Sequence, residues 1–322
     1  MLSNGRMAII GLGTMGCGIA ELAMVHGLRV CVIDSDRAAT LAGMSRLRSR
    51  ITAHVDAGLL SHDFLDMLDE VDVAEDFADL CSGVDIIIEA VPEDRGVKLK
   101  VLAMLADASA VAVIATNTSA LPIDELAVAV TSPERFIGVH FFNPAEWVPG
   151  VEIIPGQATS AATIESTVAV AELLGKRPVV VKSSPGFLAN RLQLALFAEC
   201  MRCVEEGLAT PAQIDVVVRS TFGFRLPAFG PFAVADMAGL DVYASILQTL
   251  TTSYGDRFVV SGLTELIGSG RLGVKSGSGF RDYSEAQAAA LLLRRDTACA
   301  RLLPLSDIAD ELEADQRSES PV

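Results

Sequence analysis

Three closely spaced glycines near the amino terminus constrain the fold more than any other feature of the sequence. Gly11, Gly13 and Gly16 follow a short apolar run and open a helical stretch that reaches about His26. In a strand–turn–helix unit, the first glycine makes a tight turn and the second lets the backbone approach a pyrophosphate, which the helix amino terminus binds. The spacing therefore predicts a dinucleotide-binding βαβ unit.

Asp34 supports this interpretation, because it ends the next β-branched run, Val30–Ile33. It lies about 20 residues beyond the glycines, where an acidic side chain accepts hydrogen bonds from the ribose hydroxyls of the nucleotide. A carboxylate at this point also repels a 2′-phosphate, so the sequence favours NAD over NADP as the cofactor. The alternative is a glycine-rich turn in an unrelated α/β protein, with Asp34 as a surface cap.

The pattern of apolar residues changes once along the chain. From Met7 to about Lys182, short β-branched runs alternate with longer amphipathic stretches, which is typical of βαβ units in a parallel sheet. Beyond Ser183–Gly186, the stretch Phe187–Glu206 places apolar residues at helical spacing. The expected strands lie near Met7–Gly11, Arg29–Ile33, Asp85–Ile88, Val111–Ala115, Phe136–Phe141, Val151–Ile154 and Pro178–Val181.

The sequence thus predicts the α/β fold class, with a Rossmann-type dinucleotide-binding domain followed by an all-α C-terminal domain. We expect the first domain over residues 1–184 and the helical domain over residues 185–290. A C-terminal helix and a disordered acidic tail would occupy residues 291–322. Fraying is expected from Asp307 onward, because the tail is rich in Asp, Glu and Ser.

The net charge of −16 limits the classes of partner. Nucleic acid is disfavoured because its phosphates demand a basic surface, whereas a small diffusible substrate is compatible with an acidic chain. No segment approaches the ~18 uninterrupted apolar residues of a membrane span. The six cysteines lack the density of a disulfide framework, which favours a reducing compartment. We therefore expect a cytoplasmic protein with neither a membrane nor a nucleic-acid partner.

A histidine and a glutamate are each embedded in apolar sequence. His140 lies within Gly138–Pro144, and Glu152 lies within Val151–Ile154. Burying either side chain without a partner is costly, so we expect the two to pair. A paired histidine is a general base with an orienting anion, and a base beside a nicotinamide indicates oxidation of an alcohol. Taken alone, His140 would more often be a core histidine.

Further motifs occur in order between about Met7 and Tyr283. They are Gly11–Gly16, Glu89–Asp94, Thr116–Ser119, His140–Pro144, Ser184–Phe187 with Asn190 and Arg191, Gly230–Phe232 through Asp236 to Gly239–Asp241, and Lys275–Gly277 with Gly279 and Phe280. Together these motifs resemble those of the 3-hydroxyacyl-CoA dehydrogenase family. The resemblance implies an NAD-dependent dehydrogenase that forms a homodimer through its helical domain.

The resemblance also implies roles for single residues. His140 would be the catalytic base and Glu152 the carboxylate that pairs with it. Ser119 and Asn190 match family positions that surround the reacting group and the nicotinamide. Taken alone, Ser119 would more often cap a helix that includes Glu125, and Asn190 would more often be a cap or a solvent contact.

Further cofactor contacts are implied in the same way. Asn143 matches a position beside the nicotinamide, and Glu93 and Lys98 fall where the family contacts its cofactor. Lys275 matches a lysine that approaches the cofactor from the second domain.

Several tempting residues receive a structural interpretation. Cys200 and Cys203 have the spacing of a redox or metal motif, but they lie within a helix and lack a second ligand pair. No metal site is indicated. Three arginines could meet the phosphates of coenzyme A, although a solvated helix face is favoured: Arg46, Arg48 and Arg50. Three histidines in polar, helical contexts are expected to be structural: His26, His54 and His62.

The chain departs from the CoA-specific members of the family just before Glu152. Those members continue with small and aliphatic residues, whereas this chain has Glu146–Pro149, which includes its only tryptophan. Similar branches with a Val-Pro step act on other hydroxyl compounds, including free hydroxy acids and a pyridine carboxylate derivative. Glu146 and Trp147 could reshape the acyl pocket or cover its outer rim.

The first-choice reaction is the reversible oxidation of a short-chain 3-hydroxyacyl-CoA, such as 3-hydroxybutyryl-CoA, in fatty acid metabolism. One alternative keeps the hydride-transfer chemistry on a free hydroxy acid, another small hydroxyl compound or an acyl group tethered to a carrier protein. An alternative of another class is a non-catalytic NAD-binding structural or sensor protein. The intact set of His140, Glu152 and Asn190 argues against that last alternative.

Overall fold

The computed structural model describes residues 5–318. The chain divides into two compact units, Met1–Phe197 and Ala198–Val322. The division falls within the helix α8 (Ala189–Glu205), so the first turns of this helix belong to the first unit.

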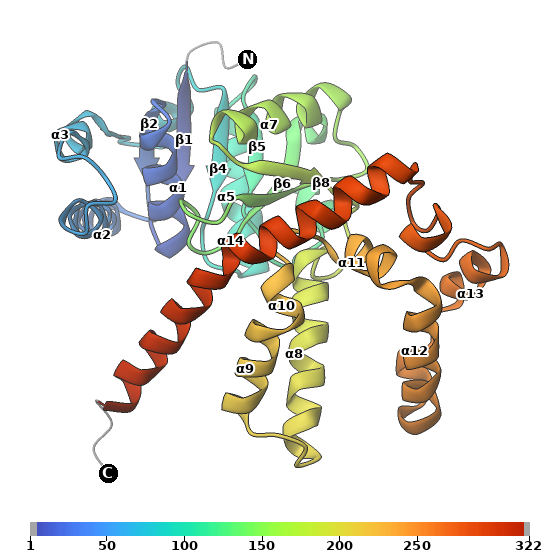
Figure 1. The fold of residues 1–322 in the computed structure, drawn as a ribbon. Helices are drawn as coiled ribbons and strands as arrows, with labels where there is room; N and C mark the ends of the chain where they lie inside the picture. The colour runs from blue at the N-terminus through green and yellow to red at the C-terminus, as the bar shows by residue number, and fades with distance from the viewer. Residues whose placement is uncertain (1–4, 319–322) are drawn as a thin grey trace. The chain divides into compact units, whose positions relative to one another are not determined.

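The first unit is built on an eight-stranded sheet with the order β3-β2-β1-β4-β5-β6-β7-β8 (Figure 1). Neighbouring strands are parallel, apart from the antiparallel pair of β6 and β7. The strands are β1 (Arg6–Ile10), β2 (Arg29–Ile33), β3 (Asp72–Val73), β4 (Ile86–Glu89), β5 (Val113–Thr116), β6 (Phe136–Phe141), β7 (Gly150–Pro155) and β8 (Arg177–Val180). The mostly parallel sheet expected from the sequence is confirmed. The two-residue β3 was not expected, because both of its residues are exposed and it has no apolar run.

Helices cover both faces of this sheet. They are α1 (Thr14–Val25), α2 (Arg37–Asp56), α3 (Asp63–Met67), α4 (Phe77–Cys81), α5 (Arg95–Ala108), α6 (Ile123–Ala127) and α7 (Ala161–Leu173), with the 3₁₀ turns η1 (Leu68–Glu70) and η2 (Pro133–Arg135). Apolar residues of α1, α2 and α7 pack on one face, and those of α4, α5 and α6 pack on the other.

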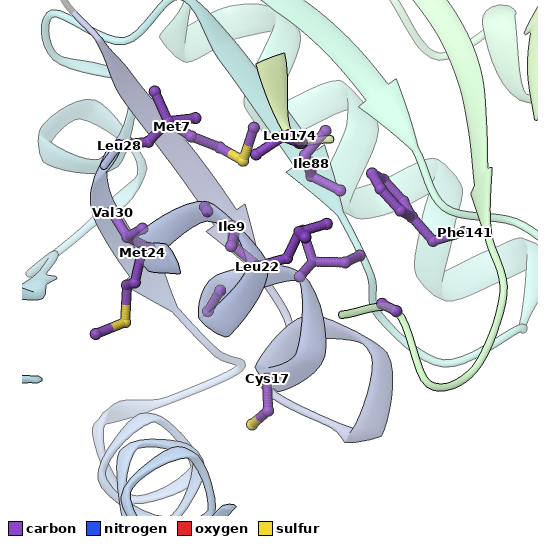
Figure 2. Packing of buried hydrophobic residues seen from close by; sticks show 14 of the residues in the cluster. Met7, Ile9, Cys17, Leu22, Met24, Leu28, Val30, Ile88, Phe141 and Leu174 are labelled. Atoms are coloured by element: carbon purple, nitrogen blue, oxygen red, sulfur yellow. The ribbon is translucent and has the colours of Figure 1, made fainter. Parts of the chain in front are cut away.

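Alternation along β1 shows how the sequence supplies both faces. Met7 and Ile9 point into the cluster that includes α1, whereas Ala8 and Ile10 point into the opposite cluster. Figure 2 shows Ile9 beside Leu22 of α1. The sheet is therefore buried on both sides, as the near-continuous apolar strands require.

The second unit is helical. Besides the end of α8, it contains α9 (Pro211–Ser220), α10 (Phe222–Arg225), α11 (Pro231–Ala238), α12 (Leu240–Tyr254), α13 (Ser261–Gly268) and α14 (Glu285–Ser318), with the 3₁₀ turns η3 (Asp256–Phe258) and η4 (Val274–Ser276). Buried Asp236 accepts hydrogen bonds from the N–H of Phe280 at 2.9 Å and the hydroxyl of Tyr283 at 2.7 Å. This carboxylate ties α11 to the segment that precedes α14.

The carboxyl-terminal segment differs from the expectation of fraying from Asp307 onward. Helix α14 continues through it to Ser318. The segment contains Ala, Leu and Glu, which favour helix, and these outweigh its acidic composition. Residues 319–322 of the expected tail lie outside the described residues. Over residues 5–318, no helix combines the length and the apolarity that crossing a bilayer demands.

Candidate functional site

A cavity of about 900 Å³ opens where β1, β4, β5 and β6 end at their carboxyl edge. Its size falls within the range of about 300–1,000 Å³ that is usual for ligand pockets. All of its lining residues belong to the first unit. Those predicted from the sequence are Gly11, Gly13, Asp34, Glu93, Ser119, His140, Asn143 and Asn190. The carboxyl edge is where open α/β sheets bind ligands.

The turn between β1 and α1 explains the glycine spacing. Gly11 adopts a φ of 89°, which side chains rarely tolerate. A Cβ on Gly16 would lie 1.8 Å from the carbonyl oxygen of Gly11, so the helix can approach the turn only with glycine at this position. A Cβ on Gly13 would meet no described heavy atom within 4 Å.

The open space at Gly13 lies at the start of α1. Among the described residues, no side chain caps this helix, and its first turn contains no acidic residue. Its first N–H groups therefore remain available for an anion. This cradle fits the pyrophosphate of a dinucleotide.

Asp34 and Arg46 border the same cavity. The carboxylate of Asp34 accepts hydrogen bonds from the N–H of Leu12 at 2.8 Å and of Ser35 at 2.7 Å. Arg46 donates from Nε and Nη2 to the carbonyl oxygen of Leu12, at 3.1 and 2.9 Å. Arg46 thus faces the pocket, whereas the sequence analysis favoured a solvated helix face for it.

The expected solvated face of arginines is correct for Arg46 and Arg48, which are exposed, but not for Arg50, which is half-buried. The Arg48 side chain is 54% exposed and pairs with Asp69 at 2.8 Å. Arg46 and Arg50 lie four residues apart on the side of α2 that packs toward α1, and both have buried partners there. His54 lies in the same charge cluster, at 2.5 Å from Glu21, which agrees with the structural role expected for it.

Glu93 gathers hydrogen bonds at the edge of the pocket. Its Oε1 accepts from the Thr118 hydroxyl at 2.6 Å, and from the N–H groups of Ser119 at 2.9 Å and Ala120 at 3.1 Å. Burial tends to raise the pKa of Glu93, but these hydrogen bonds and the charge of Lys98 outweigh it and lower the pKa. The carboxylate is thus held in its charged form.

Ser119 and Lys98 both contact Glu93. The hydroxyl of Ser119 donates to Glu93 at 3.1 Å, and α6 begins only at Ile123, so Ser119 is not its cap. Lys98 is completely buried, with Nζ at 2.8 Å from Glu89 and 3.5 Å from Glu93. Lys98 therefore supports the pocket wall from within the core and is not among the residues that line it.

His140 and Glu152 form the expected pair. They are direct cross-strand partners on β6 and β7, and both are 5% exposed. Nδ1 of His140 lies 2.8 Å from Oε2 of Glu152, which places the proton on Nδ1 and leaves Nε2 as the acceptor. The other glutamate oxygen accepts from the N–H groups of Leu188 at 3.0 Å and Ala189 at 2.9 Å. The start of α8 thus stabilises the charged carboxylate.

Three amide side chains complete the wall around His140. Asn190, in the first turn of α8, donates to the carbonyl oxygen of Ser119 at 2.8 Å. Asn143 lines the pocket just after β6. Asn117, which the sequence analysis gave no role, accepts from the N–H of Phe141 at 3.0 Å and also lines the pocket. Its place directly after β5, at the carboxyl edge of the sheet, is the signal that could have found it.

Lys275 lies in the second unit, where it forms an ion pair with Asp241. The hydrogen bond from Lys275 lowers the pKa of Asp241. The expected contact of Lys275 with the cofactor stays a prediction.

A second cavity of about 710 Å³ lies at the opposite, amino-terminal edge of the sheet. It is lined by residues such as Leu28, Val113 and Leu173, and it brings together no set of bases and amides comparable to that around His140. The carboxyl-edge pocket is therefore the candidate active site. A base with an anionic partner, set beside a dinucleotide cradle, suits proton removal coupled to hydride transfer.

Two family models match consecutive parts of the chain. The model described as "3-hydroxyacyl-CoA dehydrogenase, NAD binding domain" matches residues 6–184. The model described as "3-hydroxyacyl-CoA dehydrogenase, C-terminal domain" matches residues 186–283.

Individual relatives cover most of the chain. A probable 3-hydroxybutyryl-CoA dehydrogenase of Bacillus subtilis is 35% identical over 87% of this chain and 98% of its own length. A 5-formyl-3-hydroxy-2-methylpyridine 4-carboxylate 5-dehydrogenase of Mesorhizobium japonicum is 34% identical over 90% of this chain and 94% of its own. The crystal structure of a 3-hydroxyacyl-CoA dehydrogenase from Archaeoglobus fulgidus matches with a TM-score of 0.76 and 29% identity, over 92% of this chain and 98% of that one.

Proposed function

Because the chain belongs to the 3-hydroxyacyl-CoA dehydrogenase family and is an NAD-dependent dehydrogenase acting on CH–OH groups, we propose that its substrate is a short-chain 3-hydroxyacyl-CoA such as 3-hydroxybutyryl-CoA. The product is the corresponding 3-oxoacyl thioester, and the reaction is reversible. The observation that carries the proposal is the His140–Glu152 pair at the wall of the pocket.

The reaction divides a proton and a hydride between two acceptors. Nε2 of His140 takes the proton of the substrate hydroxyl, and the carbon–oxygen double bond forms as the hydride leaves the same carbon. Bound NAD supplies the hydride acceptor. Glu152 holds the imidazole in the required tautomer and stabilises the imidazolium, and its other oxygen is fixed by the N–H groups at the start of α8.

Polar groups around the base orient the substrate. Ser119 and Asn190 are linked to each other by a hydrogen bond, and Asn143 approaches from the end of β6. Fixed polar groups of this kind hold the oxygen that loses its proton in line with the base. We assign these three residues to the substrate and nicotinamide end of the pocket.

The remaining predicted residues belong to the cofactor. Gly11, Gly13 and Gly16 shape the pyrophosphate cradle, and Asp34 would accept the ribose hydroxyls. Glu93 and Lys275 complete the proposed cofactor site, and Lys98 supports it from the core through its contact with Glu93.

A second candidate substrate is a free hydroxy acid or another small hydroxyl compound. The segment Glu146–Pro149 favours it, because Val148 lines the pocket and the chain departs there from the CoA-specific pattern. The Mesorhizobium relative, whose name is that of a pyridine carboxylate dehydrogenase, supports the same alternative.

We further propose a homodimer in the cytoplasm. Exposed apolar side chains on α8, α9 and α12 support the dimer: Phe197, Met201, Val217 and Ile246. All six cysteines lie within the described residues and are unpaired, which suits a reducing compartment.

A substrate panel tests the proposal. 3-Hydroxybutyryl-CoA, its pantetheine thioester, free 3-hydroxybutyrate and several polar hydroxy acids are compared at saturating NAD by following NADH absorbance. If coenzyme A is recognised, binding energy from its remote nucleotide is used at the reacting carbon, so truncation should lower kcat/KM strongly. A free acid that outperforms the CoA ester would overturn the proposed substrate and leave the hydride-transfer chemistry standing.

A further inference from the structure

The loop between β6 and β7 forms one wall of the active-site pocket. Asn143 and Val148 of this loop line the cavity. Between them, Ala145 is buried, and Glu146 has a side chain that is 4% exposed. Burying the Glu146 carboxylate is costly unless it is paired. Its partner lies on another element of the fold.

Arg50 of α2 is the first partner. Its Nη2 contacts Oε1 of Glu146, and its Nε lies 2.8 Å from Oε2 of Glu21 on α1. Gly18 of α1 makes room for the loop, because a Cβ there would lie 2.8 Å from Oε2 of Glu146. The guanidinium therefore joins α1, α2 and the loop.

His54, one turn after Arg50 on α2, extends this contact. Its Nδ1 lies 2.5 Å from Oε1 of Glu21, and its ring makes an edge contact with Trp147 at 5.5 Å between centroids. Glu21, His54 and Glu146 offer atoms within 4.8 Å of one another that could bind a metal ion. However, Arg50 already pairs with both carboxylates and supplies their positive charge.

Lys176, between α7 and β8, holds the same loop from another side. It is 6% exposed, and its Nζ donates to the carbonyl oxygens of Ala145 at 2.5 Å and Val148 at 2.7 Å. Burial lowers the pKa of Lys176, while the charge of Glu146 raises it. The two cations and the carboxylates of Glu21 and Glu146 balance in formal charge.

A buried ion pair adds little stability compared with apolar side chains in its place, although removing one partner alone is costly. Replacing a buried ion pair by apolar residues of similar volume is often neutral or stabilising, so such pairs are better explained by the conformation that they specify. Here that conformation is the path of residues 144–148, which sets where Asn143 and Val148 stand in the pocket wall. Oε2 of Glu146 finds no hydrogen-bond partner among the described residues, which is a cost of this arrangement.

We propose that Arg50 and Lys176 are positioning residues that clamp the β6–β7 loop, through Glu146 and through two loop carbonyls, and thereby fix the substrate wall of the pocket. Neither residue lines the pocket itself. The expected loss of turnover on changing these residues rests on the proposed function of the pocket. The expected change in the conformation of the loop does not.

Trp147 gives a readout that needs neither substrate nor cofactor. It is the only tryptophan, it lies on the clamped loop, and it is 48% exposed. Arg50→Met should increase quenching of its fluorescence by acrylamide, and Glu146→Gln should act in the same direction. Arg48→Met is the matched control, since Arg48 is exposed on the same helix and should leave the quenching unchanged. Unchanged quenching in Arg50→Met would overturn the clamp.

Kinetics then test the link to the pocket. Arg50→Met should lower kcat/KM by about 10–100-fold, because a displacement of about 1 Å can cost 10²-fold. Much of the loss should appear as a raised KM, and Arg50→Lys should restore part of it. If Arg50 acts through Glu146, Arg50→Met should lower kcat/KM far less in the Glu146→Gln background than in the wild-type protein.

Two results separate the possible failures. If the losses of the two variants simply add, or kcat/KM is unchanged, Arg50 does not position the wall. If quenching changes while no 3-hydroxyacyl thioester is turned over, the substrate proposal fails and the clamp stands. Should Arg50→Met fail to fold by circular dichroism, Arg50→Lys, Glu146→Gln and Lys176→Met carry the same comparison.

Discussion

At the scale of single residues, the two nitrogens of His140 have separate tasks. Nδ1 is committed to Glu152 at 2.8 Å, so only Nε2 can receive a proton from substrate. The rings of Phe142 and Phe187 pack against the imidazole, at 4.5 and 5.7 Å between centroids. These contacts fix the orientation of the base before substrate arrives.

The role of His140 is tested by His140→Gln. Turnover should fall by about 10²–10⁴-fold, which is the range for loss of a positioned general base. The dissociation constant for NAD, measured by titration calorimetry, should stay nearly the same because the cofactor cradle is formed by other residues. Near-normal turnover would show that His140 is a core histidine.

At the scale of elements, two glycines of the β1–α1 turn make opposite predictions. Gly16→Ala should destabilise the fold, because its Cβ would collide with the carbonyl oxygen of Gly11; a cost of about 1–3 kcal/mol is typical of overpacking. Gly13→Ala should melt near the wild-type temperature but bind NAD more weakly, because its methyl group would fill the cradle. Thermal melts and calorimetry of both variants check this contrast. Normal binding of NAD by Gly13→Ala would contradict this prediction.

The segments after β4 and β5 should make stability depend on pH through Glu93. Its pKa is lowered in the folded state, so its contribution is complete above the ordinary value of ~4.3 and is lost as the pH falls through the folded value. Glu93→Gln should therefore differ from wild type most at neutral pH, and the difference should shrink in acid. Urea unfolding at neutral and at acid pH measures this difference in stability, and Glu125→Gln, at an exposed position, is the control. A difference that does not vary with pH would contradict the assignment.

The strands were predictable because apolar alternation reports burial directly. His140 and Glu152 could also be paired from the sequence, since each needed a partner inside apolar runs. The site of Lys98 was not predictable, because nothing local reveals that its partner Glu89 is completely buried. Arg50 was misjudged for the same reason. Its partners lie 29 and 96 residues away, a distance over which charge patterns carry no signal.

At the scale of the whole molecule, the helical unit has few buried apolar residues. Its core cluster contains Ala235, Leu240 and Leu263, while many larger apolar side chains on its helices are exposed. Surfaces of this kind usually mark an interface.

The proposed homodimer should have twice the chain mass of 33.9 kDa when measured by light scattering after gel filtration. Val217→Asp on α9 combined with Ile246→Asp on α12 should shift the mass toward that of one chain, because a charge would enter the apolar contact. The exposed variant Arg48→Met should keep the wild-type mass. A wild-type protein that elutes as a single chain at micromolar concentration would refute the dimer.

Glu152 serves two parts of the molecule with its two oxygens. One orients His140, and the other receives the N–H groups of Leu188 and Ala189 at the start of α8. A descendant of this protein that abandoned the reaction would be released from the first requirement but not from the second. In such a lineage we expect the histidine to drift while the glutamate persists. Among diverged relatives, we therefore expect a retained histidine to distinguish working enzymes, whereas a retained glutamate does not.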